Sequence, residues 1–313
     1  MGKAQKIDSK GRHTKSMSHR TTVGIATIVA LGCLGGAFYW LHGRGEQPRP
    51  EVVTASSATA PGVPEERSTA AARQPAVAPI GAPAAHELPP ADPGLPLRSG
   101  EVLEYSASIA KLNNVANLRL QVNEKRNFQG KNVWHMQAFA HTENPLRMVF
   151  VLDDQFDSYS DATSMASVQY EMHLSERGQK VDSIQRMTTS GREPAPAGAT
   201  VTRVFPGTRD PLGMMQYLRN VDWGKTPEVR GPVYDGHKLY EARASRASTD
   251  ELVAVPAGQF RTSKIDLRVF DNGAEMKDAH FSLYLADDAA HTPVLLEATL
   301  PFAVARVELV KRK

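Results

Sequence analysis

An uncharged segment near the start, Thr21–His42 with the sequence TTVGIATIVALGCLGGAFYWLH, constrains this 313-residue chain more than any other feature. A helix of about 20 residues is roughly 30 Å long, which matches the hydrocarbon thickness of a bilayer. Six Lys or Arg side chains and one Asp precede the segment, and Tyr39 and Trp40 lie at its far end. The flank of a membrane-spanning helix that is richer in Lys and Arg stays in the cytoplasm, and Tyr and Trp favour the membrane interface. The segment therefore predicts a single membrane-spanning helix over residues 22–42, with the N-terminus cytoplasmic.

Two alternatives for this segment stay open. A cleaved signal peptide has an apolar region of about 7–15 residues that ends at small side chains, whereas this one is longer and ends in FYWLH. The sequence ALGC, which ends at Cys33, is similar to a lipoprotein box, but the apolar run continues for eight residues beyond it. Cys33 is the single cysteine, so the chain can form no intrachain disulfide.

The segment that follows is rich in proline and poor in large apolar residues. Residues 43–98 hold 11 of the 21 prolines and no Phe, Tyr or Trp. Such a segment buries too little apolar surface to offset its ordering entropy, so we expect an extended, disordered linker. The predicted organisation is a basic tail (1–21), a membrane helix (22–42), a linker (43–98) and a folded domain (99–313).

The charge distribution argues against nucleic-acid binding. The chain carries a net charge of +3, but residues 1–21 alone carry +5. Residues 22–313 hold 31 basic and 33 acidic side chains. A domain that binds phosphates needs a basic surface, so we expect no nucleic-acid partner.

Short alternating segments separated by turn residues dominate from residue 99 onward. Arg177-Gly178, Asp235-Gly236 and Asn272-Gly273 mark turns, and Asn-Gly is typical of two-residue hairpins. Near the end, Ala305, Val307 and Leu309 alternate with charged residues, as in a half-buried strand. About ten such strands predict a mainly β domain, an antiparallel barrel, half-barrel or sandwich.

One segment, RDPLGMMQYLRNVDW at 209–223, predicts a short helix within this domain. Asp210 can cap its N-terminus and Pro211 suits its first turn. Met214, Tyr217 and Leu218 form its predicted apolar face.

Several sequence blocks resemble one known family. GEVLEY (100–105), DPLGMMQYLR (210–219), YDGHKLYEARAS (234–245), VPAGQFRTSKIDL (255–267) and LYLADDAAHTPVLLEA (283–298) follow one another in order. In this order the domain resembles the bacterial domain of unknown function 3108 family, with Asp210, Gly213, Tyr217 and Arg219 matching its helical motif. The resemblance implies an exported β-rich envelope domain and implies no activity.

The candidate ligand-binding residues gather on or just after the predicted helix: Asp210, Tyr217, Arg219, Asp222 and Trp223. The guanidinium of Arg219 can hold an anionic or amide group at a barrel mouth. In the alternative interpretation these residues are structural: Asp210 caps the helix, and Arg219 favours the helix C-terminus or pairs with a carboxylate from a strand.

Catalytic residues, a resident metal and a cofactor are not predicted. Asp287, Asp288, His291 and Thr292 form the nearest acid–base cluster, but they fall in a predicted turn where Asp serves local backbone bonding. The histidines lack metal-ligand spacing, and phosphate-loop and hydrolase motifs are absent. Eight methionines in the domain indicate either core filling or an adaptable apolar cavity.

The sequence therefore predicts an inner-membrane, single-pass protein with a periplasmic binding domain. Its expected partner is an apolar or amphiphilic envelope ligand or an envelope protein. The first alternative is an assembly factor that docks to an envelope complex without a small-molecule site. The second is an envelope hydrolase, which would bring together at least two of Asp210, Asp222, Asp288 and His291.

Overall fold

The structure is a computed structural model that describes residues 97–194, 197–299 and 303–313. The predicted tail, membrane helix and nearly all of the linker lie outside the described residues. Within the described ranges, no helix has the length and apolar character needed to cross a bilayer.

The described residues form one continuous sheet of 13 strands in the order β7-β6-β5-β4-β3-β2-β1-β13-β12-β11-β10-β9-β8. All neighbouring strands pair antiparallel except β6 and β7, which are parallel. The first strand pairs with the last, so the two halves of the chain join in the middle of the sheet. The strands are β1 Val102–Ile109, β2 Leu112–Phe128, β3 Lys131–Thr142, β4 Asp153–Asp161, β5 Ser167–Glu176, β6 Gln179–Thr188, β7 Ala199–Arg203, β8 Glu228–Tyr234, β9 Leu239–Val255, β10 Gly258–Asp271, β11 Ala274–Ala286, β12 Pro293–Thr299 and β13 Val304–Arg312.

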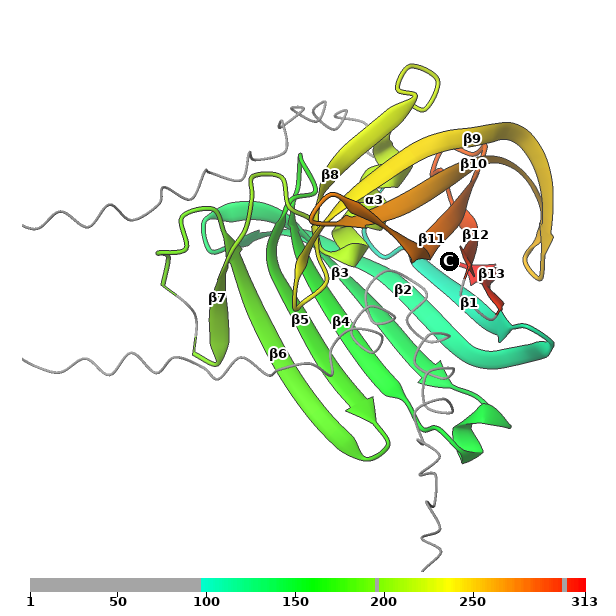
Figure 1. Ribbon diagram of the computed structural model, residues 1–313, viewed down its shortest axis with the longest axis horizontal. Helices are drawn as coiled ribbons and strands as arrows, with labels where there is room; N and C mark the ends of the chain where they lie inside the picture. The colour runs from blue at the N-terminus through cyan, green and yellow to red at the C-terminus, as the bar shows by residue number, and fades with distance from the viewer. Residues whose placement is uncertain (1–96, 195–196, 300–302) are drawn as a thin grey trace, which may run out of the picture.

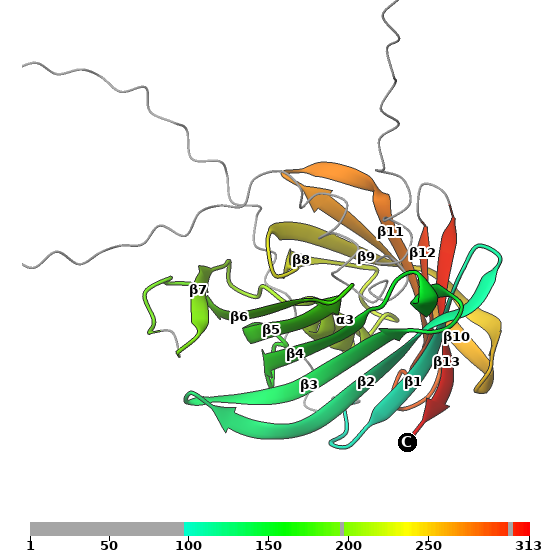
Figure 2. The ribbon, with the colours of Figure 1, turned by 90° about the horizontal axis from the view of Figure 1, so that it is seen from below.

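The sheet curls around helix α3 (Pro211–Asn220), as Figures 1 and 2 show. Its two edge strands, β7 and β8, do not pair with each other. Instead, the residue before the helix cap, Arg209, bridges to Val233 on β8. Of the three predicted architectures, the structure is therefore an open half-barrel with a helix inside.

The predicted turns and strand pattern are confirmed. Arg177 and Gly178 have φ of 51° and 79°, and Asn272 and Gly273 have φ of 48° and 83°, as two-residue hairpins require. Ala305, Val307 and Leu309 are all buried. Strand β4 was not predicted, because its sequence DDQFDSYSD is rich in polar residues.

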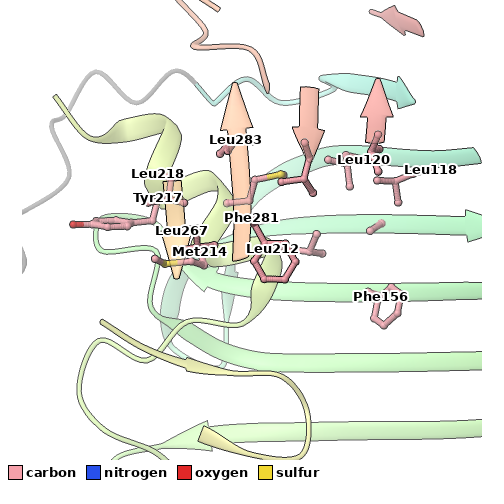
Figure 3. Close-up of a cluster of buried hydrophobic side chains, with 14 of the residues drawn as sticks. Leu118, Leu120, Phe156, Leu212, Met214, Tyr217, Leu218, Leu267, Phe281 and Leu283 are labelled. Atoms are coloured by element: carbon pink, nitrogen blue, oxygen red, sulfur yellow. The ribbon is translucent and has the colours of Figure 1, made fainter. Parts of the chain in front are cut away.

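Apolar side chains fill the space between the helix and the curled sheet, and Figure 3 shows part of this cluster. Leu212, Met214 and Leu218 from the helix meet residues of β2 and β11 such as Leu120 and Phe281. Six methionines are buried and therefore fill the core: Met136, Met165, Met172, Met187, Met214 and Met215.

Helix α3 is buried on every side, which corrects the prediction of a single apolar face. Residues 211–219 are all buried, including the polar Gln216 and the charged Arg219. Asp210 caps the helix and Pro211 occupies its first turn, as predicted.

Candidate functional site

The N-terminal end of helix α3 is enclosed by strands β4 and β5. Asp210 is completely buried, and one carboxylate oxygen accepts the Gly213 N–H at 2.9 Å. The other accepts the hydroxyls of Ser158 at 2.6 Å and Ser167 at 2.5 Å. Burial raises the pKa of Asp210, although these hydrogen bonds oppose the shift. All the partners belong to the protein, so the carboxylate serves as a cap here.

Gly213 allows the helix to approach the sheet closely. A Cβ at this position would lie 2.8 Å from the Ser160 hydroxyl oxygen and 3.1 Å from the Met165 carbonyl oxygen. Since the carbonyl belongs to the backbone, it cannot move aside as a flexible side chain can. The motif glycine is therefore explained by packing.

Arg209 and Tyr217 form a buried pair beside this end. The guanidinium of Arg209 lies 3.8 Å from the centre of the Tyr217 ring and donates to the carbonyls of Gly207 and Ser164. Burial lowers the pKa of Arg209 to about 10. Within the described residues the Tyr217 hydroxyl is buried without a hydrogen-bond partner. Arg209 is not among the predicted site residues; the one sequence signal that marks it is its position just before the helix cap.

At the C-terminal end, Arg219 joins three distant parts of the chain. Its guanidinium is fully buried and makes a bidentate pair with Glu101, at 2.8 and 2.9 Å. It also donates twice to the Ala290 carbonyl, at 3.2 and 2.9 Å, and once to Gln216 at 2.8 Å. A guanidinium has five N–H donors, so these bonds use them all. The predicted pairing of Arg219 with a carboxylate is thus present, from the residue just before β1.

The loop between β11 and β12 packs against the same helix end. The Nδ1 atom of His291 lies 2.6 Å from the Arg219 carbonyl oxygen. A carbonyl only accepts hydrogen bonds, so Nδ1 carries a proton; in the neutral form of the ring Nε2 keeps a lone pair. Asp288 accepts the N–H and hydroxyl of Thr292 and a donor of Arg312. Burial alone would raise the pKa of Asp288, but these bonds outweigh it and the pKa is lowered. The predicted turn role of Asp288 is confirmed.

A cleft of about 440 Å³ opens beside this C-terminal end. One wall is the end of helix α3 and the chain after it, residues 219–224. The second is the β9–β10 hairpin with Arg246 and Ser263. The third is the end of β11 and its loop, including Asp287 and His291. Most of the surface that lines the cleft is polar. No hydrogen bond or ion pair to another described residue engages the side chains of Arg246 and Asp287, so both are available to a ligand.

The cleft brings together three of the five predicted site residues: Arg219, Asp222 and Trp223. Asp222 is exposed and pairs with Lys225 at 2.7 Å, whereas Trp223 is buried and donates to the Leu218 carbonyl. Asp210 and Tyr217 are not part of its lining. Asp210 caps the opposite end of a ten-residue helix, roughly 15 Å away at the α-helical rise.

A second space, enclosed by apolar side chains between the helix and strands β1, β2 and β10–β13, measures only about 20 Å³. That is close to the space of one water molecule. This part of the interior is therefore filled.

Of the four residues considered for hydrolysis, two line the cleft and two do not. Asp210 is enclosed at one helix end, and Asp222 pairs with Lys225 beyond the other. Asp288 is engaged by Thr292 and Arg312. Asp222 and His291 both line the cleft, but within the described residues no hydrogen bond joins their side chains. In the part of the chain that the structure describes, no cluster of three His, Cys, Asp or Glu side chains is arranged to hold a metal ion.

Comparisons with known proteins give a family and distant structural neighbours. The family model described as "Protein of unknown function (DUF3108)" matches residues 104–310. No curated protein matches the chain. A beta-barrel-like protein of the domain of unknown function DUF1849 from Brucella abortus is 11% identical with a TM-score of 0.45, over 69% of this chain and 97% of that one. A hypothetical protein from Chlamydia trachomatis is 6% identical with a TM-score of 0.34, over 69% and 87%.

Proposed function

Since the chain belongs to the DUF3108 family of proteins of unknown function, we propose a function from its own geometry: a membrane-tethered envelope protein that binds a polar or amphiphilic ligand in the cleft beside Arg219. The anchor is the segment 22–42, and the linker of residues 43–98 holds the half-barrel on the periplasmic side of the inner membrane.

The cleft is the observation that carries this proposal. Its volume of about 440 Å³ falls within the range of small-molecule sites. Its three walls come from segments far apart in the sequence. Arg219 fixes the wall at the helix end to the wall formed by the β11–β12 loop through its bonds to Ala290. Arg246, Asp287 and Nε2 of His291 are the groups that can meet a ligand, because their neighbours do not engage them.

The chemistry of the wall favours a ligand with polar groups over a wholly apolar one. The guanidinium of Arg246 can hold a carboxylate, a phosphate or an amide oxygen. The carboxylate of Asp287 and the lone pair of His291 can accept hydrogen bonds from hydroxyl or amide groups. By contrast, the apolar space beside the helix is only about 20 Å³, too small for a lipid chain.

This filled interior is also what favours the second candidate, an assembly factor that docks to an envelope complex without a small-molecule ligand. The two candidates differ in whether the cleft is occupied in cells.

Photo-crosslinking in living cells tests occupancy. A benzophenone amino acid placed at Ser263 lies on the cleft wall, and the same residue at Lys131 lies on the exposed β2–β3 turn as a matched control. We expect an adduct at Ser263 that Arg246→Glu removes, and none at Lys131. Identical results at both positions would contradict the cleft as the binding site.

Protease added to spheroplasts tests the topology. It should digest the half-barrel, and a protected domain would contradict a periplasmic location.

A further inference from the structure

Exposed apolar side chains gather on one rim of the half-barrel, at the end of the strands opposite to Glu101 and the cleft. They lie on the β3–β4 connection or in the first residues of strands β2, β6 and β13. The most exposed are Met148 and Val149, at 81% and 76% of their surface. The others are Leu112, Val151, Val181 and Val304. We call this set the apolar rim.

The apolar rim is continuous across neighbouring strands. The Ala110 N–H donates to the Val304 carbonyl, which joins the β1–β2 turn to the start of β13. The Glu143 N–H donates to Val115, and the Arg177 N–H donates to Val151. These bonds tie the β3–β4 connection to its neighbours on both sides. The rim is therefore one surface rather than scattered single residues, and such surfaces mark interaction sites.

The longest connection in the rim is built to expose apolar groups. In the sequence PLRMVFVL (145–152), Phe150 and Leu152 point into the core and are buried. Met148, Val149 and Val151 point outward from the same segment. Burial of the core side chains explains only half of its apolar content, so the outward half calls for a partner.

The unpaired charge around the rim is positive. Lys111, Arg177 and Lys180 are exposed and make no ion pair with another described residue, while Arg177 also covers the Phe150 ring. The acidic groups nearby are engaged instead: Asp153 pairs with Arg147, and Asp182 with His173.

Two further acidic groups do not change this balance. Glu143 accepts a hydrogen bond from Asn117, and Glu176 is half-buried beside Arg177, where burial raises its pKa.

An apolar rim flanked by free cations is complementary to an anionic lipid surface, where each basic residue contributes about 1 kcal/mol of binding free energy.

The linker enters the domain at the other end. Described residues begin at Leu97, next to the start of β1, and β1 runs for 8 residues to the rim. At 3.3 Å per residue this separates the linker attachment from the rim by about 26 Å. The rim therefore lies at the end of the domain that is farther from the linker attachment.

From these observations we infer that the apolar rim docks onto a second anionic lipid surface, opposite the membrane that holds residues 22–42. The inference rests on the proposed anchoring. A linker with the flexibility predicted from the sequence of residues 43–96 would span about 40 Å on average, and more where it is extended. The protein would then bridge two apposed lipid surfaces, one through its anchor and one through the rim.

The test uses the full chain inserted in nanodiscs of neutral phosphatidylcholine, with Cys33→Ser and a single environment-sensitive NBD fluorophore. The probe stands at Val149→Cys in the rim or at Leu252→Cys, an exposed apolar position on the β9–β10 hairpin, as control. Vesicles of phosphatidylcholine, with or without 30% phosphatidylglycerol, are then added.

We expect a blue shift of the Val149 probe with anionic vesicles only, and no shift of the Leu252 probe. In vesicle co-flotation, Met148→Asp should weaken vesicle binding roughly tenfold or more, and Lys111→Glu with Lys180→Glu should do the same. Leu252→Asp should leave vesicle binding unchanged.

The proposal is wrong if added vesicles leave the Val149 probe unchanged, if both probes shift alike, or if neutral vesicles act as well as anionic ones. It is also wrong if the probe shifts only when the nanodisc itself is anionic, since the rim would then contact its own membrane. Failure of the chain to enter nanodiscs, seen by size-exclusion chromatography, would instead contradict the proposed anchor.

Discussion

The two ends of helix α3 are both fixed by motif residues, but only one of them lies next to open space. At the N-terminal end, Asp210 and Gly213 are enclosed by strands β4 and β5. At the C-terminal end, Arg219 is equally buried, yet the chain after it lines a cleft of about 440 Å³. The charged motif residues thus hold the helix, whereas residues of the neighbouring loop and hairpin, such as Asp287 and Arg246, can meet a ligand.

The difference has a simple structural origin. The N-terminal end meets two adjacent strands of one sheet, whose side chains interlock with the helix. The C-terminal end meets a loop and a bent hairpin, β9–β10, which approach from different directions (Figure 1). The side chains of β4 and β5 pack closely around the N-terminal end of the helix, whereas the loop and the hairpin leave a cleft at the C-terminal end.

The largest expected effect is on the bonds that frame the cleft. Arg219→Ala leaves the carboxylate of Glu101 and the carbonyl of Ala290 without their donors, at a cost of about 3–5 kcal/mol in the free energy of unfolding. Chemical denaturation measures it. Arg230→Ala removes an exposed arginine that also pairs with a glutamate, and should cost at most about 1 kcal/mol. Equal losses in the two variants would contradict the role given to Arg219.

A second variant probes the enclosed end. Gly213→Ala forces a Cβ against Ser160 and the Met165 carbonyl and should cost about 1–3 kcal/mol of unfolding free energy. Ser160→Ala removes the closer of the two contacts. In a double-mutant cycle, the cost of Gly213→Ala should therefore fall in the Ser160→Ala background. Two fully additive losses would show that the enclosed end is less tightly packed than described.

The pH dependence of stability should have opposite signs at the two ends. Burial raises the pKa of Asp210, so its contribution is full below the unfolded value of 3.8 and is lost as pH rises. The pKa of Asp288 is lowered by its hydrogen bonds in spite of burial, so its contribution is present above 3.8 and is lost as pH falls.

Urea denaturation between about pH 2.5 and pH 7 covers the windows of both groups, because the window of Asp288 lies below its unfolded pKa of 3.8. Relative to wild type, Asp210→Asn should gain stability as pH rises above about 4, and Asp288→Asn should lose stability as pH rises from about 2.5 to about 4. The same sign in both variants would remove the electrostatic contrast between the ends.

The smallest expected effect is at Asp222, in the cleft but exposed. Asp222→Asn removes only the pair with Lys225, so the midpoint of denaturation should not move measurably. The yield of the crosslink from Ser263 should change in the Asp222→Asn variant if Asp222 contacts the ligand. A clear loss of stability would instead make Asp222 a structural residue.

The fold was largely predictable because its turns and alternation are local signals. Asn272-Gly273 and the alternation around Val307 are decided by neighbouring residues alone. Strand β4 was not predicted, since its Ser158 and Ser160 are buried and hydrogen-bonded to each other, and Ser158 also bonds Asp210, 52 positions away. A polar side chain in the core is explained only by its distant partner.

The site was predictable only in part for the same reason. Arg219, Asp222 and Trp223 were selected for their place around the helix end, and the structure puts them around one cleft. Arg246 and Ser263 carry no local motif and reach the cleft only through the bend of the β9–β10 hairpin. Whether the selected residues bind a ligand stays a prediction.

The contrast between the helix ends can be measured directly by thiol modification in the Cys33→Ser protein. Ser263→Cys places a thiol in the cleft, and Ser160→Cys places one under the enclosed end, where the native side chain is fully buried. We expect rapid alkylation of the first thiol by iodoacetamide and, for the second, a rate limited by unfolding. Similar rates at the two positions in the folded protein would contradict it.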